Sequence, residues 1–222
     1  MSMPGPRFRS LVLDVDSTLA AIEGIDWLAA LRSEPVRDRV AGITESAMRG
    51  EVALGSVYGE RLAVVMPTRE EVGRLGREYV ERMEEGAPEA LAELANMGVR
   101  VVLVSAGIRE AILPLARTVG VPDSDVHAVR VYFTESGNYT GFNAGSPLAQ
   151  NSGKATVVRG LGLTRPILAV GDGMTDAELR TLEPPAVDAF AVYTGVVERA
   201  PVVRVADYAI RSFEQLLALM RG

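Results

Sequence analysis

Residues 11–19 read LVLDVDSTL, an apolar run that ends in two aspartates one residue apart. The run has the composition of a buried strand, and a carboxylate left unpaired at the edge of a core is costly. Because side chains alternate along a strand, Asp14 and Asp16 begin on the same face. The pair therefore predicts either a bound cation or a chemical function at the end of this strand.

Three further apolar runs have the same character, and each ends in a polar or glycine-rich turn: GVRVVLVSAG (98–107), RPILAVGDG (165–173) and VDAFAVYTG (187–195). Helical patterns lie between them, at 88–97, 108–119, 153–161 and 175–182. This alternation predicts an α/β fold, a Rossmann-like parallel sheet with helices on both faces. Residues 129–142 read as two strands around a turn, and we expect this hairpin at the edge of the sheet.

The first strand is followed by helical patterns instead of a second strand. Helices are expected over residues 36–48 and 54–65. Thr68 and Glu71 have the spacing of a capping box, which predicts the start of a charged helix that runs to Glu85. An uninterrupted helical block in this place indicates an insertion into the α/β unit.

The length of 222 residues suits one buried core with a smaller inserted unit. We predict a core domain formed by residues 1–19 and 86–222, and a helical cap domain formed by residues 20–85. No apolar run approaches the ~18 residues of a membrane helix. The start of the chain lacks the apolar segment of a signal peptide, so a cytoplasmic location is expected.

The amino-acid composition argues against several kinds of catalytic site and binding partner. The chain has no cysteine and a single histidine, His127, so a cysteine nucleophile and a zinc site of several histidines are excluded. The formal net charge of −6 argues against nucleic acid and anionic membranes as partners, and favours a small-molecule substrate. Lys154 is the only lysine, which suggests a position where a compact ammonium fits and a guanidinium does not. Both a monomer and a homodimer are compatible with the sequence.

Ligands of open α/β sheets bind at the carboxyl ends of the strands. Carboxylates and hydroxyls gather at those ends, together with the sole lysine: Asp14, Asp16, Thr18, Ser105, Lys154, Asp172, Thr175 and Asp176. Oxygen-only ligands suit Mg²⁺, and the whole set suits phosphoryl transfer with a carboxylate nucleophile. Of the first two aspartates, one can attack phosphorus while its neighbour protonates the leaving oxygen.

At these residues the sequence resembles the haloacid dehalogenase (HAD)-type phosphohydrolases. Four stretches match their motifs: DVDST (14–18), VVLVSAG (101–107), Lys154 and VGDGMTD (170–176). Within that superfamily the chain is most similar to the phosphoserine phosphatase family, and the similarity extends along most of its length. The resemblance implies a HAD-like core with an inserted cap.

The resemblance also implies roles for individual residues. Asp14 would be the nucleophile that accepts the phosphoryl group, and Asp16 the general acid and base. Mg²⁺ would be the cofactor, held by Asp14, by the backbone carbonyl of Asp16 and by Asp172. Lys154 would steady the transferring phosphate. Two further residues would support these groups without touching the substrate: Thr18 and Asp176.

For the substrate, the resemblance implies a zwitterionic phosphomonoester. Glu23 would meet its ammonium group and Arg61 its carboxylate, an arrangement of opposite charges that suits an amino acid. Met48 and Leu54 would line the pocket with apolar side chains. The remaining substrate-binding positions are Ser105, Ala106, Gly107 and Thr175. The implied reaction converts L-phosphoserine to L-serine, the final step of serine biosynthesis.

Three departures from the family pattern keep other substrates open: Ala106, Asn143 and Thr194. The alternative is a HAD-type phosphatase or phosphotransferase that acts on another small phosphorylated metabolite. A signalling receiver domain shares the acidic cluster and lysine, but it lacks a large helical insertion and a late second acidic motif. A metal-binding scaffold without catalytic activity would not need an aspartate at position 16.

Overall fold

The structure is a computed structural model that describes residues 6–48 and 54–222. At its centre is a six-stranded sheet in the order β3-β2-β1-β6-β7-β8, in which every neighbouring pair is parallel. Its strands are β1 (Ser10–Leu13), β2 (Arg100–Ile108), β3 (Val126–Val129), β6 (Ile167–Gly171), β7 (Ala189–Tyr193) and β8 (Tyr208–Ile210). The predicted Rossmann-like parallel sheet is therefore confirmed.

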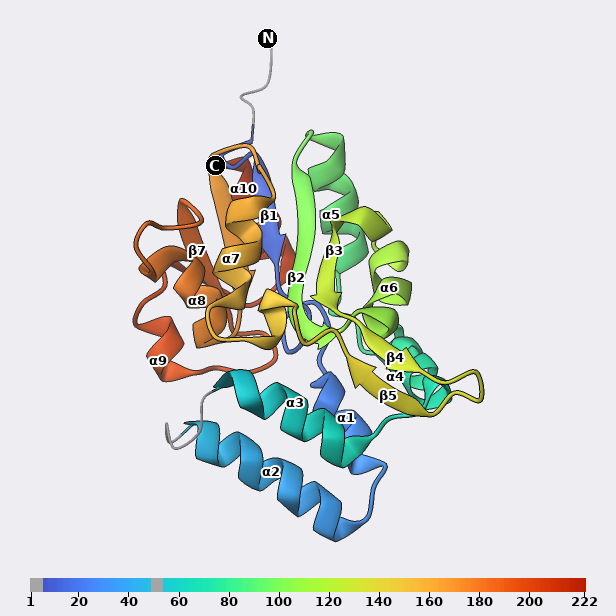
Figure 1. Ribbon diagram of the computed structural model, residues 1–222. Helices are drawn as coiled ribbons and strands as arrows, with labels where there is room; N and C mark the ends of the chain where they lie inside the picture. The colour runs from blue at the N-terminus through green and yellow to red at the C-terminus, as the bar shows by residue number, and fades with distance from the viewer. Residues whose placement is uncertain (1–5, 49–53) are drawn as a thin grey trace.

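Helices cover both faces of this sheet (Figure 1). They are α5 (Ala87–Asn96), α6 (Arg109–Thr118), α7 (Gly153–Gly160), α8 (Met174–Thr181), α9 (Ala200–Val203) and α10 (Phe213–Arg221), with 3-10 turns η1 (Asp123–Asp125) and η2 (Pro147–Ala149). Helix α5 packs beside α10, and α7 packs beside α8. Figure 1 shows α7 in front of the strands and α10 behind them. The central strands β1, β6 and β7 are buried along their whole length, as expected of a sheet covered on both faces.

Four helices lie between β1 and α5, within the residues predicted to form the cap: α1 (Gly24–Ala30), α2 (Glu34–Met48), α3 (Leu54–Val65) and α4 (Arg69–Glu81). Figure 1 shows α1, α2 and α3 beyond one end of the sheet. The predicted capping box is present, since the Thr68 hydroxyl accepts from the Glu71 N–H and the Glu71 carboxylate accepts from the Thr68 N–H. Helix α4 ends before Glu85 because the chain returns to the core there, with Met83 paired to Ala20. The boundaries at residues 20 and 85 stay predictions.

The expected hairpin at residues 129–142 forms, but its predicted place at the edge of the main sheet is wrong. Strands β4 (Val131–Phe133) and β5 (Tyr139–Phe142) form a separate antiparallel pair. Because β3 occupies the edge beside β2, the hairpin does not extend the main sheet, and its strand β5 contacts α3 instead. There Phe142 packs edge-on against Tyr58 of α3, with the ring centroids 5.3 Å apart.

The register of the sheet aligns the ends of its central strands. Leu13 of β1 lies opposite Leu103 of β2 and Val170 of β6. The polar residues that follow these positions consequently meet at one edge. Within the described residues, no helix is both long and apolar enough to cross a membrane.

Candidate active site

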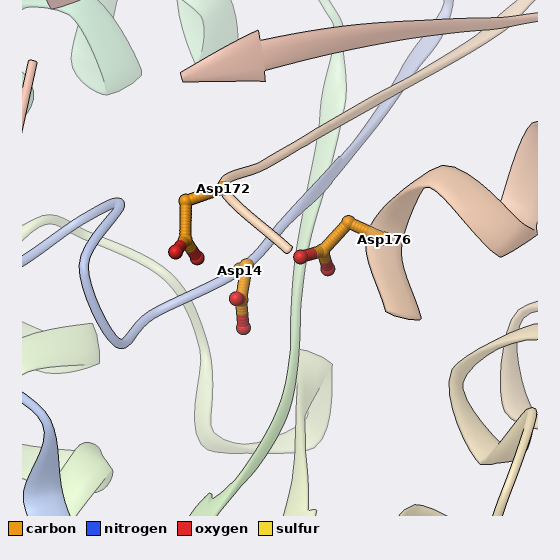
Figure 2. Close-up of side chains that lie close together, drawn as sticks. All are labelled: Asp14, Asp172 and Asp176. Carbon is orange, nitrogen blue, oxygen red and sulfur yellow. The ribbon is translucent and has the colours of Figure 1, made fainter. Parts of the chain in front are cut away.

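Three buried carboxylates gather at the carboxyl edge of the sheet (Figure 2). Asp14 follows β1, Asp172 follows β6, and Asp176 lies in the first turn of α8. One oxygen from each carboxylate lies within 4.8 Å of the other two. Figure 2 shows the Asp176 side chain directed toward the other two aspartates. Such a cluster of oxygen donors could hold a divalent cation.

The close approach of Asp176 to β6 depends on the glycines around it. A Cβ at Gly171 would lie 2.1 Å from the Asp176 Cγ, so only glycine leaves room for this carboxylate. The Gly173 N–H donates to Asp176 Oδ2 at 3.1 Å, which caps the N-terminus of α8. The GDG sequence therefore both shapes the turn and places the carboxylate.

Lys154, in the first turn of α7, joins two of the aspartates. Its Nζ lies 2.8 Å from Asp14 Oδ1 and 2.6 Å from Asp176 Oδ1. Burial by itself lowers the pKa of this ammonium, but Asp14 and Asp176 more than offset that effect and raise the pKa above its ordinary value. Lys154 is therefore a permanent cation, packed where its compact head group contacts two carboxylates at once.

Asp16 occupies a different environment from Asp14. Its Oδ1 accepts from the Gly24 N–H at 3.0 Å and from the Tyr79 hydroxyl at 2.5 Å. Burial, together with the negative charge of Glu23, raises the pKa of Asp16 to about 7. A carboxyl group that holds its proton near neutral pH is suited to donating it to a leaving group. Tyr79 was not predicted, because nothing in the local sequence of α4 distinguishes it from a core residue.

Asp172 is paired with an arginine that the sequence did not single out. Arg199, which precedes α9, lies 3.0 Å from Asp172 Oδ2 and 3.6 Å from Glu23 Oε1. Burial, together with the negative charges of Asp14 and Asp176, raises the pKa of Asp172 to about 8, although Arg199 opposes the shift. The pKa of Asp176 is likewise raised by burial and by Asp14. The only sequence signal for Arg199 was its position shortly after a strand end.

The last residues of β2 lie beside the carboxylates, where the pairing of β2 with β3 shifts register between Val104 and Ile108. Ser105 is buried, and its Oγ accepts from the Gly107 N–H at 2.8 Å. A Cβ at Gly107 would lie 3.0 Å from Asp16 Oδ2 and 3.1 Å from Ser105 Oγ, so this approach favours glycine. Ala106 is exposed between them. The end of β2 thus presents backbone and hydroxyl groups next to Asp16.

Two neighbouring cavities open at this edge. The first, which we call the acidic cavity, has a volume of about 200 Å³ and is lined by the carboxylate cluster with Asp16, Glu23, Ser105, Ala106, Lys154, Gly173, Thr175 and Arg199. The second, which we call the adjoining cavity, has a volume of about 270 Å³ and is lined partly by Val57, Tyr58, Arg61, Leu148, Ala149 and Glu178. Ala106, Lys154 and Thr175 border both. A ligand bound at the carboxylates can therefore extend into the adjoining cavity.

Most of the predicted site residues lie at these cavities, but they differ in their exposure and in their hydrogen-bond partners. Glu23 lines the acidic cavity, accepts from the Ser17 hydroxyl at 2.8 Å and is exposed. Arg61 lines the adjoining cavity, where its guanidinium is paired with Asp26. Thr18 is fully buried, and its hydroxyl has no hydrogen-bond partner among the described residues. Two predicted lining residues have side chains that lie outside the described part: Met48, which ends α2, and Leu54, which begins α3.

Comparison with known proteins decides the family. The haloacid dehalogenase-like hydrolase family matches residues 11–179, a span that includes the whole carboxylate cluster. The chain belongs to this family. The predicted HAD-like fold class and the predicted relationship to phosphohydrolases are thereby confirmed, and the receiver-domain alternative is excluded.

Individual relatives within the HAD-like family agree with this assignment. The chain is 36% identical to the phosphoserine phosphatase of Bos taurus, across 95% of this chain and 92% of the relative. It is 33% identical to the chloroplastic phosphoserine phosphatase of Arabidopsis thaliana, across 94% of this chain and 70% of the relative. The crystal structure of a phosphoserine phosphohydrolase-like protein from Francisella tularensis has the same fold, with a TM-score of 0.83 and 24% identity over 96% of this chain and 99% of that one.

Proposed function

We propose that this protein is a Mg²⁺-dependent phosphomonoester hydrolase that converts L-phosphoserine to L-serine through a phosphoryl group carried on Asp14. The observation that carries the proposal is the contact of Lys154 with both Asp14 and Asp176 beside the acidic cavity. The similarity to phosphoserine phosphatases along nearly the whole chain supports the choice of substrate.

In the first half of the reaction, a carboxylate oxygen of Asp14 attacks phosphorus. Lys154 provides a fixed positive charge 2.8 Å from this carboxylate, which offsets the repulsion between two anions. Ser105 and Ala106, near the end of β2, line the acidic cavity, so the Ser105 hydroxyl and the backbone N–H groups beside it would face the phosphate and could donate to its oxygens. The phosphoryl group would then be held between Asp14 and the end of β2.

The donor set fits Mg²⁺. Asp14, Asp172 and Asp176 offer only oxygen, and among the described residues these three buried carboxylates are paired with the two cations Lys154 and Arg199. The ion would be held by Asp14, Asp172 and the backbone carbonyl of Asp16, with Asp176 nearby on Lys154. Bound there, it would supply charge stabilisation for the transferring phosphoryl group.

Asp16 would act as the general acid and then as the general base. Its raised pKa of about 7 allows it to protonate the leaving alcohol oxygen near neutral pH. Once the alcohol has left, the same carboxylate can take a proton from water as that water attacks the phosphorylated Asp14. Water would have to be excluded during the first step and admitted during the second.

Glu23 and Arg61 would select the substrate. They line the two neighbouring cavities, and their opposite charges suit the ammonium and carboxylate groups of an amino acid. The pairing of Arg61 with Asp26 favours a second candidate, a small phosphomonoester without a carboxylate, because such a substrate would leave this pair intact.

Phosphate release from a panel of esters separates the two candidates. The panel contains L-phosphoserine, phosphothreonine, phosphoethanolamine, glycerol phosphate and p-nitrophenyl phosphate, each assayed with Mg²⁺ and with a chelator. Strong Mg²⁺-dependent preference for L-phosphoserine supports the proposal, and preference for an ester without a carboxylate supports the second candidate. Asp14→Asn serves as the blank, and full activity in that variant would contradict the mechanism.

A further inference from the structure

The two oxygens of the Asp16 carboxylate have different surroundings. Oδ1 receives two hydrogen bonds, from the Tyr79 hydroxyl at 2.5 Å and from the Gly24 N–H at 3.0 Å. Oδ2 lies against Gly107, where a Cβ would be only 3.0 Å from it. One oxygen is therefore held by α1 and α4, and the other lies beside the end of β2, where the phosphate is proposed to bind.

Tyr79 reaches Asp16 from a remote part of the chain. It belongs to α4, has no solvent exposure, and lies 63 positions after the aspartate to which it donates. The approach depends on Gly24, since a Cβ there would lie 2.2 Å from the tyrosine oxygen. The first residue of α1 thus leaves room for the hydroxyl and donates to the same oxygen through its own N–H.

Helix α4 is itself held firmly in place. Gly76 lies so close to α6 that a Cβ would be 3.2 Å from the Ala111 carbonyl oxygen. Because α6 packs on β2 and β3 of the main sheet, α4 connects the sheet to the tyrosine hydroxyl. Tyr79 therefore offers Asp16 a donor whose position is fixed by two packed helices.

We propose that Tyr79 is a positioning residue for Asp16, which holds Oδ1 so that the proton for the leaving group is carried on Oδ2. In this step an electron pair of Asp14 forms the new O–P bond while the ester P–O bond breaks and its electron pair remains on the leaving oxygen. The Oδ2 proton passes to that oxygen, and Asp16 becomes a carboxylate with Tyr79 and Gly24 still donating to Oδ1. The inference rests on the proposed acid role of Asp16.

The test compares two leaving groups in Tyr79→Phe. L-Phosphoserine releases an alkoxide that needs a proton, whereas p-nitrophenyl phosphate releases a phenolate that is stable without one. If Tyr79 positions the acid, kcat/KM for L-phosphoserine falls about 10- to 100-fold while kcat/KM for p-nitrophenyl phosphate changes less than about twofold. Equal losses with both substrates, or no loss with either, would overturn the inference.

Tyr193→Phe is the matched control, since this buried tyrosine also donates to a carboxylate, Glu84, but does not border either cavity. It should leave both kcat/KM values unchanged. If Tyr79→Phe does not fold, Gly24→Ala displaces the hydroxyl while keeping the tyrosine, and the same leaving-group difference is expected. If the wild-type enzyme does not cleave L-phosphoserine but does cleave glycerol phosphate, only the proposed substrate is refuted. In that case glycerol phosphate replaces L-phosphoserine as the alkyl ester that is compared with p-nitrophenyl phosphate.

Discussion

The ammonium of Lys154 lies 2.8 Å from the carboxylate of Asp14, and both side chains are buried. Asp14 follows β1 and Lys154 lies in the first turn of α7, so the helical insertion and the strands β2 and β3 lie between them in the chain. A buried ion pair is weak evidence for stability, because desolvation offsets most of its Coulomb energy. Its position at the edge of the acidic cavity instead supports the proposed role of Lys154 in catalysis.

Removing the ammonium should reduce both activity and stability. Lys154→Met leaves Asp14 and Asp176 buried without their shared cation, so we expect kcat to fall at least about 100-fold and the free energy of unfolding to fall by about 3–5 kcal/mol. Steady-state kinetics and urea unfolding measure the two effects. Arg117→Gln removes an exposed ion pair with Asp123 and should change neither. Wild-type kcat in Lys154→Met would contradict the assigned role.

The position of Lys154 should depend on the glycine before it. A Cβ at Gly153 would lie 1.7 Å from the Pro147 carbonyl oxygen, so Gly153→Ala must displace the start of α7 and its lysine. We expect a lower melting temperature together with lower kcat. At the other end of the same helix, a Cβ at Gly160 would meet no atom within 4 Å, so Gly160→Ala should be neutral or slightly stabilising. Equal melting temperatures for the two variants would contradict this account.

Stability should depend on pH and Mg²⁺ together. The pKa of Asp172 is about 8 in the folded chain against an ordinary value of 3.8, so the folded state binds this proton more tightly than the unfolded state does. The resulting stabilisation is complete below the ordinary value and is lost as pH rises through about 8. Because Mg²⁺ needs ionised carboxylates, it should raise the melting temperature more at about pH 9 than at about pH 6.

Differential scanning calorimetry with Mg²⁺ and with chelator at both pH values measures this difference. Asp172→Asn removes the titrating group and a predicted ligand, so it should abolish most of the Mg²⁺-dependent increase. An equal increase in melting temperature at the two pH values would mean that the ion does not compete with protons at this cluster.

Substrate selection can be divided between Glu23 and Arg61. If Glu23 meets the ammonium group, Glu23→Gln should raise KM for both L-phosphoserine and phosphoethanolamine about tenfold. If Arg61 meets the carboxylate, Arg61→Gln should raise KM for L-phosphoserine alone. Glycerol phosphate, which has neither group, is the internal control for both variants. Loss of activity toward all three esters would show that the variants disturb the site instead of its selectivity.

The sequence predicted which residues gather at the edge of the sheet better than it predicted their contacts. Asp14, Ser105 and Asp172 were placed correctly at one edge, because apolar runs mark the strands and parallel strands end on the same side. The hairpin at residues 129–142 was misplaced, since its alternating pattern does not reveal which partner it pairs with. Tyr79 and Arg199 were not predicted, because the local sequence around a tyrosine in a helix or an arginine in a loop does not indicate which distant carboxylate it will contact.

By itself, the sequence determined the alternation of strands and helices, the helical insertion after β1, and the oxygen-rich set of groups at the strand ends. These properties follow from local periodicity and from which residue types are present, so they can be recognised without knowing distant contacts. Only the tertiary structure decided that Lys154 joins Asp14 to Asp176, that Arg199 faces Asp172, and that Tyr79 reaches Asp16. Each of these contacts joins segments far apart in the chain, and their approach depends on how whole helices pack on the sheet.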